Sequence, residues 1–334
     1  MNKNANFKRV KDTFAGLLKK NGAVALMMVI IMVLFLTITD GKLFFSAFNL
    51  QALQFAIAPE GIVAIGMMLL LITGVFDLSV GSVMCFGGLV TAMSLNSGLP
   101  IIVSIVLGLL AGAAVGLING ILVEVGGINP LIATIGTMYV FRGASELLLV
   151  GRGKGGFAGF PDAFVKLGRG QFLGMFWMFW IFIILVAVFS VFVATRPSGR
   201  RLYFIGGNEP AAKLMGINKR KIRIIAYIIS GILAALAGIL ITAKSDAANR
   251  YTGQTSHMTV IIASVIGGGS MNGGQGTVLG ALFGITFLSL LQNAFNLFNV
   301  ESSLQRIIIG AVLMTVVSTD GFMTLKRLKE LGRI

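Results

Sequence analysis

The stretch "IIVSIVLGLLAGAAVGLINGILV" (101–123) contains no charged residue and is long enough to cross the apolar core of a bilayer as a helix. Similar apolar runs recur along the chain of 334 residues, of which 56% are hydrophobic and only 12% are charged. A soluble domain carries about a quarter charged residues, so this chain has too little polar surface to coat a globule in water. The sequence therefore predicts an all-α, polytopic membrane protein.

The apolar runs predict about ten membrane-spanning helices of roughly 20 residues each. We expect them near 23–39, 57–73, 78–97, 101–123, 131–150, 173–195, 224–243, 258–270, 277–298 and 304–319. The first run follows a basic segment, but no small-residue cleavage site follows it. We therefore expect a retained first helix rather than a removed signal peptide.

The formal net charge of +15 is concentrated outside those runs. Basic residues gather before the first run, in a central loop over 196–223 and at the C-terminal end, which is typical of cytoplasmic segments. We expect a cytoplasmic N-terminal segment over 1–22, one transmembrane domain over 23–320, a cytoplasmic tail over 321–334 and an external loop over 151–172. Charge placed in this way indicates a lipid bilayer as partner and argues against nucleic acid.

The sequence offers little for catalysis. Cys85 is the single cysteine and His257 the single histidine, which excludes an internal disulfide and a multi-histidine metal site. There is no GxSxG motif and no GxxxxGK[ST] phosphate loop. We therefore expect no catalytic residue, no metal and no cofactor on this chain.

Ionisable residues inside the predicted spans are costly and are the first candidates for function. Glu60 lies near the start of the second span. Arg142 and Glu146 lie four residues apart on one helical face, where they could neutralise each other. Phe141 and Tyr139 add aromatic surface beside Arg142, whereas Arg306, early in the last span, is more typical of interfacial snorkelling.

A second polar cluster is uncharged and lies in "LLQNAFNLFNV" (290–300). Gln292 and Asn296 share one helical face, and Asn293 lies on the adjacent one. Amides interleaved with phenylalanines suit a neutral polyhydroxy ligand, because amides bond hydroxyls and rings stack on C–H faces. The same amides could instead form interhelical hydrogen bonds. The residues alone leave both interpretations open.

In "LITGVFDLSVGSV" (71–83), Asp77 is a carboxylate between Gly74 and Gly81 in an otherwise apolar segment. The predicted topology puts it at the cytoplasmic end of the second span, where it could cap the next helix rather than serve as a proton or substrate site. The segment 74–83 also aligns without gaps to 269–278. The offset between the two segments is 269 − 74 = 195 residues, and it also carries the first four spans roughly onto the last four. This pattern indicates an internal repeat.

The central loop carries the most informative pattern, Gly207-Asn208-Glu209-Pro210-Ala211-Ala212 through Gly216-Ile217. It is similar to the G-N-x-x-A-A-x-x-x-G-I pattern in the coupling loop of ribose-type, monosaccharide ABC-transporter permeases. The resemblance extends over nearly the whole chain, through "DLSVGS" (77–82), "NPLIATIGTMYVFRG" (129–143), "GGGSMNGGQGTVLGALFG" (267–284) and "LLQNAFNLFNV" (290–300).

The resemblance implies a type II-like ABC importer permease in the bacterial inner membrane that imports a ribose-like monosaccharide. A second copy or a paralogue would complete the path, a periplasmic or lipid-anchored sugar-binding protein would dock outside, and a cytoplasmic ABC ATPase would bind ATP-Mg. It also implies a structural hinge at Gly74, Asp77 and Gly81. The residues expected to contact the ATPase are Gly207, Asn208, Glu209, Ala211, Ala212, Gly216 and Ile217.

The chain departs from the family pattern in "TSHMTVIIASVIGGG" (255–269), where an acidic residue is usual and His257 stands here, and at Val75-Phe76. A nucleoside or another furanose-like ligand is the alternative within the family. An ion-coupled secondary transporter that uses Glu60, Asp77 and Glu146 is the alternative from another class.

Overall fold

The computed structural model describes residues 22–150 and 156–330. Apart from Gly22, the predicted N-terminal segment over 1–22 lies outside the described residues. Part of the predicted external loop (151–155) and the end of the predicted tail (331–334) also lie outside them.

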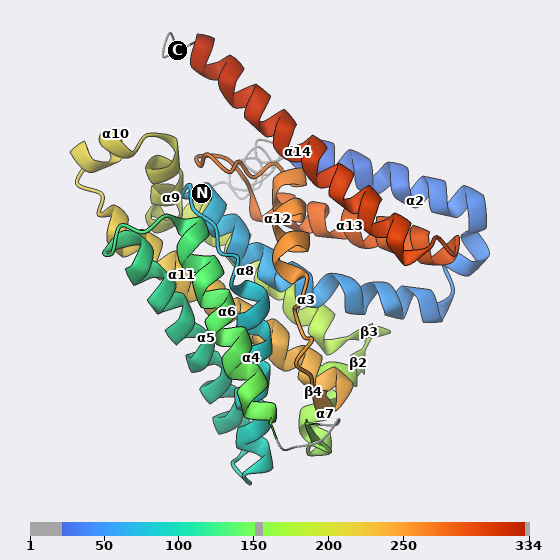
Figure 1. The fold of residues 1–334 in the computed structure, drawn as a ribbon. Coiled ribbons are helices and arrows are strands. Elements are labelled where there is room, and N and C mark those ends of the chain that lie inside the picture. The colour runs from blue at the N-terminus through green and yellow to red at the C-terminus, as the bar shows by residue number, and fades with distance from the viewer. Residues whose placement is uncertain (1–21, 151–155, 331–334) are drawn as a thin grey trace, which may run out of the picture.

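The described chain is built mainly of helices, and each predicted apolar run overlaps one of them (Figure 1). These helices are α2 (Ala23–Phe44), α3 (Ala47–Ile72), α4 (Val80–Asn96), α5 (Ile101–Glu124), α6 (Pro130–Leu149), α8 (Trp177–Thr195), α11 (Lys219–Ser245), α12 (Ser256–Ile266), α13 (Val278–Leu297) and α14 (Ser302–Glu330). Among the described residues, 6 helices are long and apolar enough to cross a membrane, namely α2, α3, α5, α8, α11 and α13. The count of about ten spans stays a prediction.

The largest boundary errors concern the start of α3, at Ala47 rather than near 57, and the end of α14, at Glu330 rather than near 319. Ser46 caps α3 by accepting a hydrogen bond from the Asn49 backbone N–H at 3.3 Å. Pro59 lies inside the same helix. The predicted start near 57 left out the polar residues Asn49, Gln51 and Gln54, which belong to the helix.

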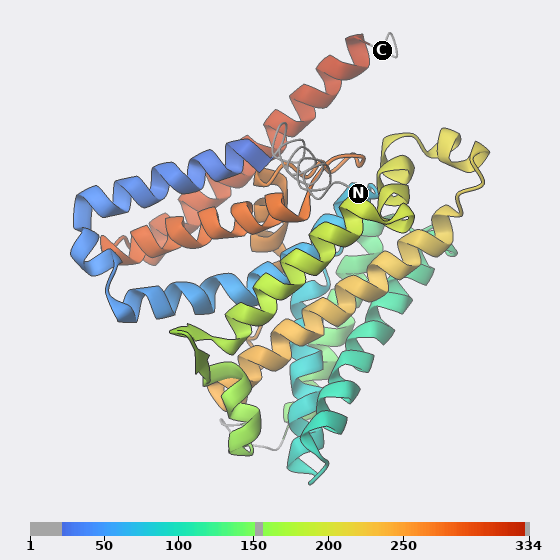
Figure 2. The same ribbon diagram turned by 180° about the vertical axis from the view of Figure 1, so that it is seen from behind.

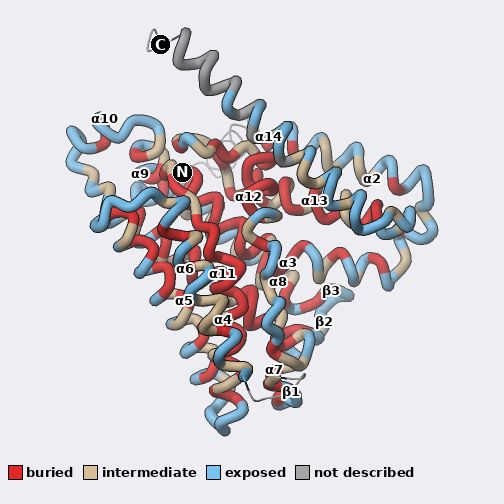
Figure 3. Tube along the Cα trace, in the orientation of Figure 1, coloured by how far each residue is buried: buried red, intermediate tan, exposed pale blue. Residues whose placement is uncertain are grey.

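Two groups of helices lie on either side of α3. Figures 1 and 2 show α2, α13 and α14 together on one side, and α4, α5, α6 and α11 together on the other. Buried residues concentrate along α3 and along α4 and α11 of the second group (Figure 3). α5 lies directly against α11, since a side chain on Gly112 would overlap the Gly231 backbone.

The helix α12 is short, at 11 residues, and does not cover the predicted 258–270. Between β4 (Ala247–Ala248) and α12 the chain runs without helix through residues 249–255 (Figure 1). At 1.5 Å per residue, α12 spans about 16 Å, roughly half of an apolar core. α12 is therefore too short to cross the apolar core alone, and a series of turns over 250–255 precedes it.

The predicted external loop contains regular structure. β1 (Phe157–Ala158) pairs antiparallel with β4, α7 (Asp162–Arg169) follows, and β2 (Gln171–Phe172) forms a hairpin with β3 (Met175–Phe176). The central loop is structured too, with α9 (Pro197–Gly207) followed by α10 (Glu209–Leu214). Pro210 lies in the first turn of α10, where a helix tolerates proline. α11 begins at Lys219, inside the range 196–223 predicted for the loop.

Candidate functional site

The short helix α10 is bounded by residues that fix its ends. Asn208 caps it, with its Oδ1 accepting from the Ala211 N–H at 3.1 Å. Gly216 turns the chain with a φ of +72°, a conformation that a side chain disfavours. Asn218 then caps α11 by accepting from the Lys221 N–H at 3.0 Å. The conformation of the predicted coupling loop is therefore encoded locally.

The loop exposes apolar side chains at its tip. Leu214 is 91% exposed and Met215 is 62% exposed, beside Gly216. Ala212 is buried and Ala211 half-buried, so these two alanines pack the helix onto its own loop. This exposed apolar pair is a candidate contact surface for another protein. The family pattern had pointed to the alanines and not to Leu214.

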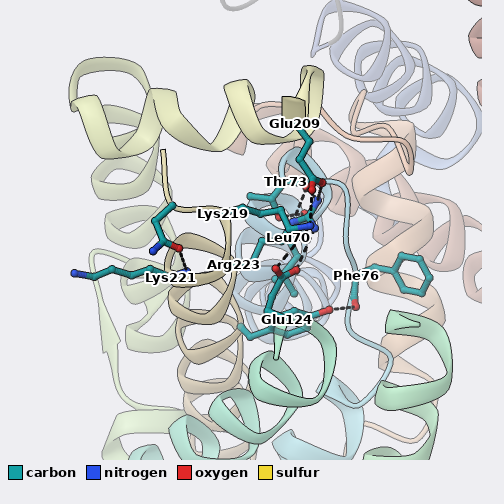
Figure 4. A network of polar contacts seen from close by, with 10 residues as sticks. Leu70, Thr73, Phe76, Glu124, Glu209, Lys219, Lys221 and Arg223 are labelled. Atoms are coloured by element: carbon teal, nitrogen blue, oxygen red, sulfur yellow. Dashed lines mark hydrogen bonds and ion pairs between the residues drawn. The ribbon is translucent and has the colours of Figure 1, made fainter. Parts of the chain in front are cut away.

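A buried ion pair anchors the loop to the transmembrane helices (Figure 4). Arg223 Nη1 lies 3.1 Å from Glu124 Oε1, with side-chain exposures of only 11% and 2%. Arg223 also donates from Nε at 3.1 Å and from Nη2 at 2.6 Å to the Thr73 carbonyl, just past the end of α3. One guanidinium therefore joins α11, α5 and α3.

Glu209 of α10 extends this ion pair into the loop. Its Oε1 lies 2.6 Å from Lys219 Nζ and its Oε2 lies 3.9 Å from Arg223 Nη2. Lys219 Nζ in turn lies 4.0 Å from Glu124 Oε2 (Figure 4). The four side chains form an alternating charge network between α10 and the membrane-spanning helices.

A second contact attaches α9 to the end of α3 and to the segment 267–277. Gly206 lies against the Ile72 carbonyl and the Gly274 N–H so closely that a Cβ would overlap both. The Gly274 N–H donates to the Ile72 carbonyl at 2.9 Å, and the Tyr203 hydroxyl donates to the Gly276 carbonyl at 2.8 Å. Burial raises the pKa of Tyr203 to about 12, which keeps its hydroxyl protonated as a donor.

The predicted hinge forms a closed polar network. Asp77 Oδ1 accepts from the Ser79 N–H at 2.8 Å and from its hydroxyl at 2.6 Å, and Asn119 Nδ2 donates to both carboxylate oxygens at 3.3 and 3.4 Å. Thr137 Oγ1 donates to Asn119 Oδ1 at 2.6 Å. Asp77 therefore bonds the residue before α4 rather than free N–H groups in the first turn, and it joins the start of α4 to α5 and α6.

The two glycines of this hinge meet other segments. Gly74, with a φ of +80°, lies beside Gly273, and Gly81 packs against the Gly253 carbonyl. The segments 73–79 and 267–277 are thus neighbours at the same end of the helices.

The amides on α13 lie in two different environments. Asn293 and Asn49 exchange two side-chain hydrogen bonds, of 2.6 and 3.2 Å, between α13 and α3. Asn296 Oδ1 is near Gln305 Nε2 at 3.4 Å, and Gln292 is half-buried. Asn293 is therefore engaged in interhelical bonding, the second of the two interpretations of this cluster.

Arg142 does not pair with Glu146 among the described residues, which corrects the predicted neutralisation. Its Nη1 instead donates to the carbonyls of Arg250 and Thr252, both at 2.9 Å, while Glu146 is exposed. These carbonyls belong to the turns before α12, where the backbone makes no helical hydrogen bonds. Arg142 supplies donors that this break in the helix requires. Arg306 is exposed at the start of α14.

Polar and aromatic side chains gather around the same break. Glu60 of α3 accepts a hydrogen bond from the Ser256 hydroxyl, and its other oxygen is buried with no partner among the described residues. His257 lies near Gly81. Tyr139 of α6 and Tyr251, in the segment before α12, are 71% and 60% exposed. Phe141 of α6 contacts Phe86 of α4, with ring centroids 5.1 Å apart.

Known proteins match this chain over most of its length. The profile of a family described as "Branched-chain amino acid transport system / permease component" matches residues 49–317. The ribose import permease protein RbsC of Escherichia coli is 35% identical over 92% of this chain and 95% of its own. The chain belongs to this permease family.

Further relatives of the permease act on different sugars. RbsC of Haemophilus influenzae is 34% identical over 85% of the permease and 88% of its own length. The L-arabinose transport system permease protein AraH of Escherichia coli is 33% identical over 89% of the permease and 90% of its own length. No solved structure matches the permease. The predicted resemblance to ribose-type ABC permeases is thus confirmed, and the permease is a multi-pass protein of the bacterial inner membrane.

Proposed function

We propose that the permease is the membrane-spanning subunit of an ATP-driven importer for a monosaccharide, with ribose or arabinose as the first substrates to test. The relatives named for these sugars support the substrate class. The observation that carries the mechanism is the attachment of α9 and α10 to the ends of α3 and α5 through Arg223, Glu124 and Gly206.

The mechanism follows from this attachment. A cytoplasmic ABC ATPase would bind the loop at Leu214 and Met215 and at the residues of the family pattern, and would bind ATP-Mg itself, while this chain holds no cofactor. When the ATPase moves, α10 moves α9, and α9 carries the ends of α3 and of the 267–277 segment with it. Both termini would then be cytoplasmic and about ten helices would cross the bilayer.

The substrate path would follow the exposed side of α6, the non-helical segment 249–255 and α12. Tyr139 and Tyr251 supply aromatic faces, and the backbone lacks helical partners beside them. Broken helices near the middle of the membrane form the binding sites of many transporters. A second copy or a paralogue would cover this side, and a periplasmic or lipid-anchored sugar-binding protein would deliver the sugar and choose it.

The experiment is uptake into proteoliposomes that contain the permease and an ABC ATPase that co-purifies with it, with a sugar-binding protein added outside. We expect uptake of radiolabelled ribose or arabinose only with ATP on the ATPase side. Uptake by the permease alone, driven by a proton or sodium gradient, would instead establish an ion-coupled transporter, for which the partly unpaired Glu60 would be the first residue to test. Transport of a nucleoside, with no transport of either sugar, would show that the permease is a nucleoside importer of the same family.

A further inference from the structure

A cavity of about 610 Å³ opens between α8, α9 and α11, apart from the contacts that anchor the loop. Its floor is apolar and includes Phe192 of α8, Ile225 and Ile229 of α11, and Leu69 of α3. Its size lies within the range of about 300–1,000 Å³ in which proteins bind small organic ligands.

The rim of this cavity is basic. Arg200, Arg201 and Lys221 line it, and no carboxylate is among the lining residues in the described part of the chain. None of these three side chains has an ion pair within the described residues, whereas neighbouring Lys219 and Arg223 are paired with Glu209 and Glu124. The rim therefore presents three uncompensated positive charges.

The cavity lies at the boundary between membrane and water. α8 ends at Thr195 and α11 begins at Lys219, and the lining extends along α11 as far as Ile229. At 1.5 Å per residue, ten residues of helix carry the floor about 15 Å along α11 from the charged rim. A segment of a water-soluble partner has no reason to enter apolar surface at that depth, but an acyl chain does.

We propose that this cavity binds a phospholipid with an anionic headgroup. The phosphate lies among Arg200, Arg201 and Lys221, and one acyl chain lies along Phe192, Ile225 and Ile229. Basic pockets beside transmembrane helices favour such lipids, because each Lys or Arg near the surface attracts the phosphate while apolar surface covers the chain. Because Met215 and Gly216 also line the cavity, a bound lipid would contact the segment that follows α10.

The first test measures lipid retention by the full-length permease. The protein is placed in nanodiscs with equal amounts of phosphatidylglycerol and phosphatidylcholine, extracted into mild detergent and analysed by native mass spectrometry. We expect wild type to retain phosphatidylglycerol, and R200Q/R201Q to bind it about thirtyfold more weakly because two charges are removed. The matched control is R220Q, since Arg220 is exposed next to Lys221 but does not line the cavity.

A second variant separates a lipid from a free phosphate. Ile225→Trp fills the floor without changing charge, and we expect it to reduce retention of phosphatidylglycerol, whereas Val188→Trp on the exposed surface of α8 leaves retention unchanged. Millimolar inorganic phosphate should not displace the lipid. Equal retention in R200Q/R201Q and wild type, or in Ile225→Trp and wild type, overturns the proposal, as does an equal loss in R220Q.

A measurement on wild type keeps the proposal testable if a variant fails to fold. Photoactivatable phosphatidylglycerol should cross-link to peptides that contain Phe192 or Ile225. Labelling spread evenly over α2 and α8 overturns the proposal. Loss of the cross-link when the ATPase binds also overturns the proposal, because the cavity is then part of the surface that the ATPase binds.

Discussion

Arg223 and Glu124 form a buried ion pair, with Nη1 and Oε1 3.1 Å apart, at the point where α11, α5 and the end of α3 meet. The pair lies beneath a loop whose outer charges, on Glu209 and Lys219, are half-exposed. Buried and exposed ion pairs respond differently to mutation, so this one network offers variants whose losses of stability should differ in size.

Glu124→Ala should destabilise the permease by about 3–5 kcal/mol, because the guanidinium of Arg223 would be left buried without its carboxylate. Thermal unfolding in detergent measures the effect. Glu209→Gln is the matched variant, since its side chain is 49% exposed and its loss should cost less than about 1 kcal/mol. Equal losses in the two variants would show that the pair does not anchor the loop.

Gly206→Ala should lower ATP-driven uptake, since its methyl group would overlap the Ile72 carbonyl and push α9 away from α3. Overpacking of this kind costs about 1–3 kcal/mol, so folding should survive while the coupling weakens. Uptake is compared at equal amounts of folded protein. Gly310→Ala is the control, because nothing lies within 4 Å of a Cβ at that position. Full uptake by Gly206→Ala would remove this contact from the mechanism.

Leu214→Asp should weaken binding of the ATPase at least tenfold, because a side chain that is 91% exposed in the free permease would be buried in the complex. Binding is measured by surface plasmon resonance, with the detergent-solubilised permease immobilised and the ATPase titrated over it. Leu173→Asp, at a residue that is 76% exposed between β2 and β3, tests whether any exposed leucine has this effect. An unchanged affinity for Leu214→Asp would place the docking surface elsewhere on the loop.

Asn293→Leu should destabilise the permease by roughly 0.6–1.7 kcal/mol, as expected for an interhelical amide pair in a membrane. The double variant with Asn49→Leu should recover part of that loss, since no amide is then left unpaired. Thermal unfolding of the four proteins gives the coupling. If the double variant is stable but does not transport, the amides contact substrate after all.

Arg142→Leu should lower both stability and uptake, since the carbonyls of Arg250 and Thr252 would lose their donor. Glu146→Leu should leave the thermal stability within about 0.5 kcal/mol, because this residue is exposed and makes no ion pair with Arg142 among the described residues. A comparable loss of stability in both variants would restore the predicted pair.

The sequence predicted the helical segments well because hydrophobicity and length alone mark a transmembrane helix. It missed the first turns of α3, where Asn49 is polar yet belongs inside the protein, and it overextended α12 because the residues after Ile266 are small rather than polar. Neither error is visible from hydropathy, since both depend on what another helix supplies.

The predicted coupling loop was assigned from a sequence pattern that resembles ribose-type permeases, and its conformation is fixed locally by the caps and the turn at Asn208, Gly216 and Asn218. The charge network was missed because Glu124 and Arg223 are 99 residues apart and each looked like an ordinary charge beside a span. Gly206 could have been noticed as the first member of a Gly-Gly pair, but its contact with Ile72 depends on the tertiary fold.

The position of Gly206 between the ends of α3 and the 267–277 segment has a mechanical consequence. α9 touches the end of α3 and the 267–277 segment at this one glycine, so we expect a displacement of α9 to be shared by both of them. The end of α3 and the 267–277 segment would then change position together in one step, and an intermediate in which only one of them has moved would require the contacts at Gly206 to break.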